Sequence, residues 1–254
     1  MPSCSKAKNP QGIEITFTEA DHRYRSIIDG KEISYISGTT FLGKFFKPFA
    51  PTGEITRKCA LKRGVTVEAL KEEWRLKGLE ATTYGTRVHE TCEDVFNDRE
   101  FRNTPNNTKE EFAFKHAKRI SAKIKERLDI LGIEYIVFNH RLRLAGTIDL
   151  FAKSKTDDTY YIIDHKTNKE IEQENKWNNF ALEPISHVPD TNFSHYALQL
   201  NLYEYLLKYG KYVPLNAKFR LFLNHITENG ARLIELPNYQ TEIREMIIEH
   251  LLNN

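Results

Sequence analysis

Cysteine is scarce in this chain and shows no metal-binding spacing. The three cysteines, Cys4, Cys59 and Cys92, lie far apart, and none belongs to a CxxC pair. Disulfide frameworks and zinc or iron–sulfur sites need several cysteines at short, regular spacings. We therefore expect three reduced, structural cysteines and neither kind of site.

Long apolar runs are also missing. No stretch approaches the roughly 20 apolar residues that a membrane helix needs. The opening stretch, MPSCSKAKNPQG, has neither the apolar core of a secretory signal nor the Arg-rich amphipathic pattern of a transit peptide. We expect no membrane partner, an intracellular, cytoplasmic location, and a flexible tail over residues 1–12.

An excess of one charge is missing as well, since 37 Lys and Arg residues stand against 35 Asp and Glu residues. The net charge of +2 neither requires nor excludes a polyanionic partner, so local clusters must decide. There is no Gly/Ser/Pro-rich linker and no internal repeat. A chain of 254 residues without them is expected to fold as one domain over residues 13–254.

Apolar periodicity predicts an α/β protein with a mixed central sheet flanked by helices. The expected helices cover residues 39–80, with breaks at Pro48, Pro51 and Gly64, and residues 84–96, 110–131, 194–210 and 239 onward. The expected strands lie within residues 13–36, around a tight turn at Asp29-Gly30, and at residues 133–143, 145–153, 159–165, 218–226 and 231–236. A polar and aromatic loop is expected over residues 169–193.

The stretch YYIIDHK ends an apolar strand in charged residues. Alternation along a strand places Asp164 and Lys166 on one face and His165 on the other. The preceding strand candidate meets this one through a short polar turn at residues 154–158. An antiparallel hairpin centred on that turn places Asp149 directly across from Asp164.

Two carboxylates in such a pair have their Cβ atoms about 5 Å apart. They repel, or share a proton, unless a cation lies between them. A hard divalent ion with oxygen ligands, Mg²⁺ or Mn²⁺, resolves this conflict, and Lys166 would stand beside the ion and its bound water. The alternative is an ordinary salt bridge between Asp164 and Lys166 at an exposed strand end, with Asp149 capping a turn.

Gly85, His89 and Glu93 recur at every fourth residue and form one stripe on a predicted helix. A glycine lets another backbone approach closely, and a neutral histidine can bind a metal. Glu93 could orient that ring or add negative charge. The alternative is that His89 is a packed or capping residue.

Tyr196, Gln199 and Tyr203 form a similar stripe on the later helix. The amide of Gln199 and the hydroxyl of Tyr203 would suit the positioning of a phosphodiester or a nucleotide. The alternative is that the tyrosines pack on the sheet and the amide caps a neighbour.

Four short motifs follow one another between residues 84 and 203. They are GTRVH with Gly85 and His89, GTID with Gly146 and Asp149, DHK with Asp164 and Lys166, and QLNLY with Gln199 and Tyr203. In this order and with these gaps, they resemble the PD-(D/E)XK nuclease superfamily, in its RecB-type branch. The flanks are similar to those of small single-domain phage and mitochondrial genome maintenance exonucleases. The resemblance implies a restriction-endonuclease-like αβββαβ core over about residues 84–225.

The resemblance also implies roles for single residues. Asp149 and Asp164 would bind one or two Mg²⁺ or Mn²⁺ ions with the main-chain carbonyl of His165, and His89 would complete the metal site. Lys166 would be the catalytic lysine. The residues implied to support the site or the DNA are Gln199, Tyr203, Gly85, Glu93 and Gly146. Branch members with an iron–sulfur cluster use four cysteines around the core, so the cysteines here exclude a cluster.

Further substrate contacts are open to two interpretations. Lys115 and Arg119 lie one turn apart on the predicted helix over residues 110–131, where they could contact phosphates or form a solvated face. Trp177, in the loop after the catalytic strand, could stack on unpaired bases or anchor the loop to the body.

The function expected from these features is metal-dependent hydrolysis of DNA from an end. In the family, water attacks a phosphodiester and leaves a 5′-phosphate and a 3′-hydroxyl. We expect an exonuclease in recombination, repair or phage DNA processing, with a replication or recombination protein as a further partner, acting in a bacterial host if phage-encoded. The alternatives are a structure-specific endonuclease and a catalytically silent DNA-binding or structural protein. Polarity and oligomeric state stay open.

Overall fold

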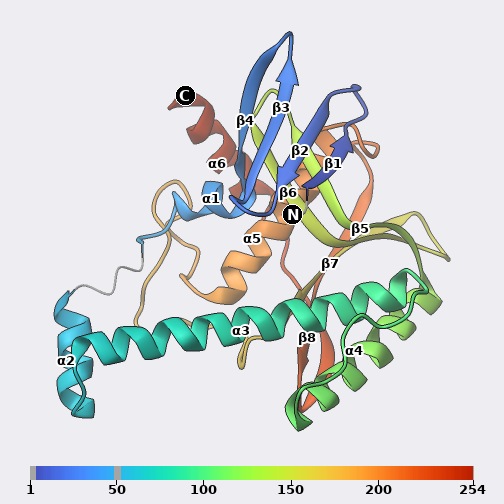
Figure 1. Cartoon of the computed structure of the whole chain (residues 1–254). Coiled ribbons are helices and arrows are strands. Elements are labelled where there is room, and N and C mark those ends of the chain that lie inside the picture. The colour runs from blue at the N-terminus through green and yellow to red at the C-terminus, as the bar shows by residue number, and fades with distance from the viewer. Residues whose placement is uncertain (1–3, 49–52, 254) are drawn as a thin grey trace.

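One mixed sheet runs through the protein (Figure 1). The structure is a computed structural model, and it describes residues 4–48 and 53–253. The described residues form nine strands in this sheet. The strands are β1 (Cys4–Lys8), β2 (Glu14–Thr18), β3 (Arg23–Ile28), β4 (Lys31–Ser37), β5 (Leu128–Asn139), β6 (Leu144–Ser154), β7 (Thr159–Lys166), β8 (Lys218–Thr227) and β9 (Gly230–Glu235). The predicted fold class, a mixed sheet flanked by helices, is confirmed.

The helices cover both faces of the sheet. They are α1 (Gly38–Gly43), α2 (Gly53–Arg63), α3 (Val67–Phe96), α4 (Thr108–Arg127), α5 (Asn192–Tyr209) and α6 (Gln240–Leu252). One apolar core joins α1, α5 and α6 to one face, and a second joins α3 and α4 to the other. Three longer helices have a capping side chain at their N-terminus. The side chains of Thr66, Asn107 and Thr191 each accept a hydrogen bond from a backbone N–H of the first turn.

Strand β6 is the centre of the sheet. Along one edge it pairs with β5 over nearly its whole length. Along the other edge it pairs with β4 at Leu144 and Ala145, and with β7 only from Leu150 to Lys153. The stretch of β6 between these two partners therefore has one edge without a neighbouring strand, and Asp149 lies in it.

The N-terminal strands extend the sheet as a meander of antiparallel pairs. The predicted turn at Asp29-Gly30 joins β3 to β4, and both residues have positive φ, of 50° and 76°. Residues 4–8 differ from the expected flexible tail, because they form β1 and pair with β2. The two strands pair along their whole shared length. Their backbone groups therefore form hydrogen bonds with each other, whereas those of a free tail would bond to water.

Two predicted boundaries differ from the structure. The break expected before residue 84 is absent, and α3 is one continuous helix. The polar stretch 71–83 is part of this helix, although almost all of it is exposed. Helix α4 ends at Arg127, and residues 128–131, expected to form its last turn, belong to β5. Residues 128–130 pair with the end of β6, and this long-range pairing overrides a helical pattern. Pro51 lies outside the described residues.

No helix in the described part of the chain is both long and apolar enough to cross a lipid bilayer.

Close packing on Gly146 brings α5 against the open stretch of β6. The ring of Tyr203, which is buried, lies so near that a Cβ added at Gly146 would fall 2.3 Å from its Cε1. A Cβ added at Gly38 would meet the same atom at 3.1 Å. The ring is thus clasped between two glycines, and neither could carry a side chain without moving it.

We expect Gly146→Ala to lower the free energy of unfolding by about 1–3 kcal/mol, because the added methyl group overpacks the Tyr203 ring. Urea denaturation measures this. Gly78→Ala, on the exposed part of α3 with no atom within 4 Å of the added Cβ, is the matched control. It should be neutral or stabilising by up to about 1 kcal/mol. An equal effect of both substitutions would contradict the packing argument, as would full additivity of Gly146→Ala with Tyr203→Leu.

Candidate active site

The hairpin of β6 and β7 has the predicted register. Leu150 pairs with Ile163, and three further pairs lead toward the turn. The next position in this register sets Asp149 across from Asp164. The ladder ends there, and the backbone N–H of His165 donates to Oδ2 of Asp149 at 2.8 Å instead of to a backbone carbonyl. The carboxylate of Asp149 thus bridges the point at which the two strands separate.

Asp164 and Lys166 share one face of β7, as predicted. Nζ of Lys166 is in ion-pair contact with Oδ2 of Asp164, and the two side chains are only 19% and 7% exposed. Burial alone would lower the pKa of Lys166. The negative charges of Asp164 and Asp149 have a larger effect than burial and hold the pKa of Lys166 above its usual value. Burial raises the pKa of Asp164, against the opposing effect of Lys166. The pair is therefore a buried one, not a salt bridge at an exposed strand end.

His165 points to the opposite face of β7. Its ring is buried, its Nδ1 is hydrogen-bonded to the amide of Asn224 at 3.0 Å, and it meets the ring of His89 edge-on with centroids 5.4 Å apart. Burial lowers the pKa of His165 to about 3, so the ring is neutral. The side chain packs away from Asp164 and Lys166 as expected, and the carbonyl of His165 as a metal ligand stays a prediction.

Helix α3 brings His89 to the carboxylates. Nδ1 of His89 lies 3.4 Å from Oδ2 of Asp149. One turn earlier, a Cβ added at Gly85 would lie 3.2 Å from Oγ1 of Thr167, the residue that follows Lys166. The close approach expected at Gly85 therefore exists, but in the middle of α3 instead of at a helix start.

Glu134 of β5 is a further carboxylate at this place. Its two chain neighbours pair with Leu150 and Ile148, so Glu134 stands beside Asp149 on the neighbouring strand. Its φ of 48° is left-handed and uncommon for a glutamate, a kind of strain that proteins often retain at functional sites. Desolvation by the crowded surroundings raises the pKa of Glu134 to about 8, and the charge of Asp149 adds to the shift. The side chain nevertheless keeps access to solvent.

Sequence reasoning missed Glu134, although a signal was present. It is the one carboxylate in the apolar stretch over residues 133–138. The preceding hairpin obeys the same register rule. A hairpin centred on the turn at residues 140–143 places Glu134 across from Asp149, so three carboxylates line up on three neighbouring strands.

These side chains fit a divalent metal ion. One donor atom from each of His89, Glu134 and Asp149 lies within 4.8 Å of the others. Carboxylate oxygens and an imidazole nitrogen are ligands that divalent ions accept, and the two acids supply negative charge. Beyond its ion pair with Lys166, the buried Oδ2 of Asp164 meets no regular hydrogen-bond donor among the described residues. It therefore retains capacity for a cation.

Helix α5 contributes the other predicted stripe. Nε2 of Gln199 donates to Oη of Tyr203 at 2.9 Å. Oη of Tyr196 donates to Oδ1 of Asn168 at 3.0 Å, and the Tyr196 ring lies 4.8 Å from Nζ of Lys166. Tyr196 thus lies beside Lys166, whereas Gln199 bonds to Tyr203, whose ring packs on Gly146 of the sheet. A role of Gln199 and Tyr203 toward the substrate stays a prediction.

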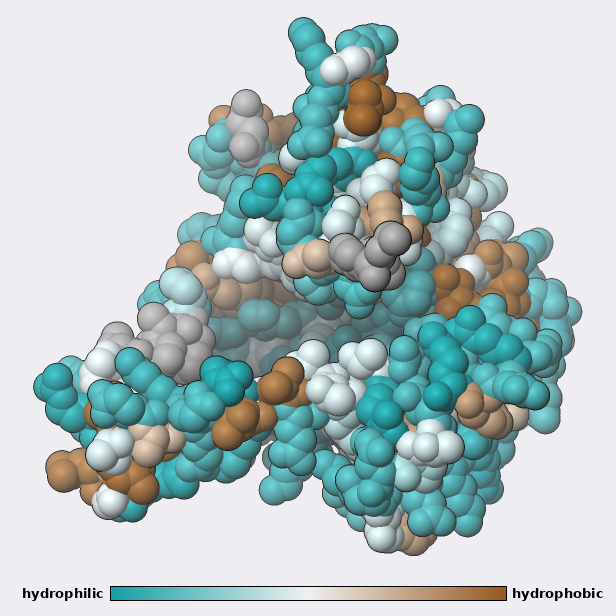
Figure 2. Space-filling view, viewed as in Figure 1, coloured by the Kyte–Doolittle hydropathy of each residue, from teal (hydrophilic) through white to brown (hydrophobic). Residues whose placement is uncertain are grey.

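The site opens into a cleft of about 1250 Å³. Figure 2 shows this face hollowed between the N-terminal strands and α3. His89 and Tyr203 line the cleft, together with two arginines and five carboxylates. These acids are Glu19, Asp21, Glu90, Glu93 and Glu134. Such a surface would repel a polyanion unless bound cations reversed its charge.

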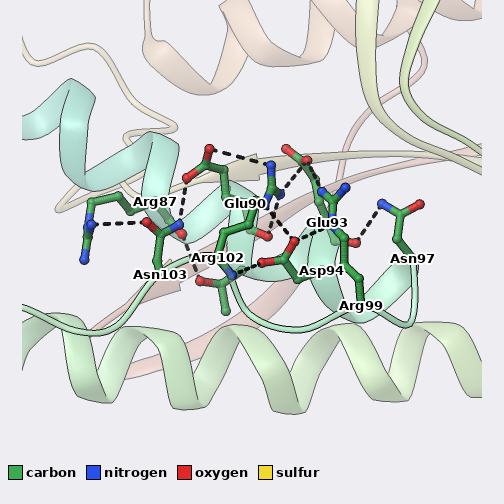
Figure 3. A network of polar contacts seen from close by, with 9 residues as sticks. Arg87, Glu90, Glu93, Asp94, Asn97, Arg99, Arg102 and Asn103 are labelled. Atoms are coloured by element: carbon green, nitrogen blue, oxygen red, sulfur yellow. Dashed lines mark hydrogen bonds and ion pairs between the residues drawn. The ribbon is translucent and has the colours of Figure 1, made fainter.

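A network of charged side chains, drawn in Figure 3, stabilises the end of α3 that carries His89. Asp94 has no exposed surface and accepts the backbone N–H of Arg102 at 2.9 Å and its Nε at 2.8 Å. Nε of Arg99 also donates to Asp94. Glu93, expected to act on His89, accepts from Nη2 of Arg102 at 2.8 Å. The loop after α3 is thus tied back onto the helix by charge.

Four predicted substrate residues, Gln199, Trp177, Lys115 and Arg119, lie outside the lining of the cleft. Trp177 is 84% exposed, so it does not anchor its loop. Ala181 and Ile185, both buried in the core beside α5, do so instead. Lys115 and Arg119 are exposed on α4, and Lys115 lines a separate surface cavity near the start of that helix.

A mixed sheet with a lysine, a histidine and neighbouring carboxylates at one point of its central strands is the arrangement of a hydrolytic nuclease. A family model described as the PD-(D/E)XK nuclease superfamily matches residues 56–253. The chain belongs to this superfamily, whose members generally use divalent metal ions. A search of curated proteins found no significant match.

The Asp94 network should make stability depend on pH. Burial would raise the pKa of Asp94, but the hydrogen bonds from Arg102 and Arg99 outweigh it and hold this pKa below its usual value of 3.8. A carboxyl whose pKa is lower in the folded state stabilises the fold above its unfolded pKa and loses this contribution as the pH falls through the folded pKa. We expect a loss of unfolding free energy below about pH 4, measured by urea denaturation at several pH values.

Asp94→Asn should lower the free energy of unfolding at pH 7 by about 1–3 kcal/mol and flatten this acid dependence. Asp98→Asn is the control, because Asp98 is 83% exposed and its ion pair with Lys125 lies at the surface. It should change stability by less than about 0.5 kcal/mol. An acid profile of Asp94→Asn equal to that of the wild type would contradict the role of the network.

Proposed function

We propose that this nuclease is a Mg²⁺- or Mn²⁺-dependent DNA exonuclease of the RecB-type branch, acting in recombination, repair or phage DNA processing. The observation that carries the proposal is the grouping of His89, Glu134 and Asp149 beside the buried pair of Asp164 and Lys166. His89 and Glu134 also line the open cleft. A carboxylate cluster beside a charged lysine suits a substrate whose reacting group is a phosphodiester.

The metal would be held by His89, Glu134 and Asp149, with Asp164 as a further ligand. When bound, a divalent ion supplies a nucleophilic water near neutral pH and stabilises negative charge on the phosphate. Lys166 is held protonated by Asp164 and Asp149, so it can donate a hydrogen bond to a phosphate oxygen. Gln199 and Tyr203 would restrain the site from the α5 side.

The preference for DNA ends is supported by the segments that flank the four motifs, which are similar to those of small single-domain exonucleases. The N-terminal half of α3 also projects away from the sheet (Figure 1), and its exposed face could guide a strand toward the cleft. Trp177 is free to stack on an unpaired base because its side chain is 84% exposed.

The direct test is degradation of linear single-stranded and duplex DNA, labelled separately at the 5′ and 3′ ends, beside a closed circle. We expect loss of the linear DNA with Mg²⁺ or Mn²⁺, none with a chelator, and an intact circle. Lys166→Ala should reduce the rate at least about 100-fold, because the transition state loses a charged donor.

The outcomes separate the alternatives. Cutting of the closed circle would show an endonuclease. Intact DNA throughout, from protein with a normal unfolding transition, would overturn the enzymatic proposal. Full activity of Lys166→Ala would remove the lysine from the mechanism.

Glu134 yields a separate test of the metal site. We expect Glu134→Gln to weaken Mn²⁺ binding at least about tenfold, because one negatively charged ligand becomes neutral. Isothermal titration calorimetry measures this without any substrate. Glu126→Gln, an exposed position on α4, is the control and should bind Mn²⁺ as the wild type does. Equal affinities for all three proteins would exclude Glu134 as a ligand.

A further inference from the structure

A second cavity lies just beyond the end of β7. Its volume is about 620 Å³, and its walls come from the segment after β7, the turn between β8 and β9, and the start of α4. It shares no lining residue with the acidic cleft. Thr167, which follows Lys166 in the chain and lies against Gly85, is one of its lining residues. The cavity therefore begins one residue from the lysine of the active site.

Positive charge surrounds this cavity. Lys109, Lys169 and Arg232 line it, against two acids, Glu170 and Glu228. Within the part of the chain that the structure describes, none of the three cations forms an ion pair with a carboxylate. Unpaired cations around a cavity are available to an anionic ligand, in contrast to Arg102 of the acidic cleft, which is paired with Glu90, Glu93 and Asp94.

The cationic surface continues along α4. A neighbouring cavity of about 570 Å³ shares Lys109 with the first and extends to Lys115. Nζ of Lys109 lies 4.4 Å from the centre of the Tyr84 ring, a cation–π contact that restrains the ammonium group. The two cavities share Lys109, Glu228 and Asn229, so four cations line adjoining cavities. This arrangement suits a linear polyanion better than a single small anion.

The segment that carries Lys169 is held in place. Nε2 of His225 is hydrogen-bonded at 2.7 Å to the carbonyl oxygen of Asn168. Lys169 follows Lys166 by three residues, so at most about 11 Å of chain separates them. One strand that reaches Lys166 could therefore also pass Lys169.

We propose that this cavity binds backbone phosphates of the nucleic-acid strand whose cleavage occurs at Lys166. Lys109, Lys169 and Arg232 contact phosphates close to the scissile bond, and Lys115 extends the track. The inference rests on the proposed function, because it takes the active site as the point of cutting. It assigns the sequence-independent part of substrate affinity to a surface separate from the metal cleft.

Salt dependence of binding tests the proposal. The probe is a fluorescent single-stranded DNA oligonucleotide, measured by anisotropy at 50–200 mM NaCl with Mg²⁺, and every protein carries Lys166→Ala so that cutting does not interfere. Lys109→Gln, Lys169→Gln and Arg232→Gln are combined in one variant. We expect the slope of log Kd against log salt to fall by about 2, because each phosphate contact on a single strand contributes about 0.7.

A matched control removes three charges elsewhere. It combines Lys31→Gln, Lys211→Gln and Arg244→Gln, three exposed positions outside both cavities. Its slope should stay within about 0.3 of the parent. Equal slopes for the two triple variants, or no binding of the oligonucleotide by the parent, would overturn the proposal.

The test is independent of catalysis. If the cavity variant loses slope but the protein with native Lys166 cuts no DNA, the phosphate surface stands and the proposed nuclease function fails. If the native protein cuts DNA and the cavity variant keeps its slope, the nuclease function stands and this inference fails.

Discussion

The separation of β6 from β7 at Asp149 is the constraint on which the rest of the site depends. Where two strands part, backbone groups lose their ladder partners, and a buried N–H must find another acceptor. Here the carboxylate of Asp149 accepts the N–H of His165 at 2.8 Å, so an acid is required at the split for structural reasons. The same acid faces Asp164 on one side and Glu134 on the other. Three carboxylates therefore crowd together at the place where the sheet is open to a cleft.

This crowding is tolerable only because positive charge is nearby. Lys166 compensates Asp164 from the same strand, and His89 approaches Asp149 from α3. The remaining negative charge is what a divalent cation would neutralise. The left-handed φ of 48° at Glu134 is a strained conformation of the kind that proteins often retain at functional sites.

The position of α3 is controlled at two points. Gly85 allows the helix to touch the residue after Lys166, and the network around Asp94 ties down the end of the helix beyond His89. Between these points, α3 lines the acidic cleft with Thr86, His89, Glu90 and Glu93. The cationic cavity is lined by other elements, and α3 only touches its Thr167 through Gly85. The acidic cleft suits metal ions and the reacting phosphate, and the cationic cavity suits phosphates farther along a strand.

The order of the elements, the mixed sheet and the pairing of Asp149 with Asp164 can be predicted from the amino-acid sequence. Those features follow from local rules, because a short hairpin turn sets register and strand alternation sets the face of each side chain. Four other features are seen only in the folded chain: α3 is one continuous helix, β1 forms from the expected tail, Glu134 joins the site, and Trp177 is exposed. These outcomes depend on pairing and packing between segments far apart in the chain, and that free energy exceeds the local preference of any single segment.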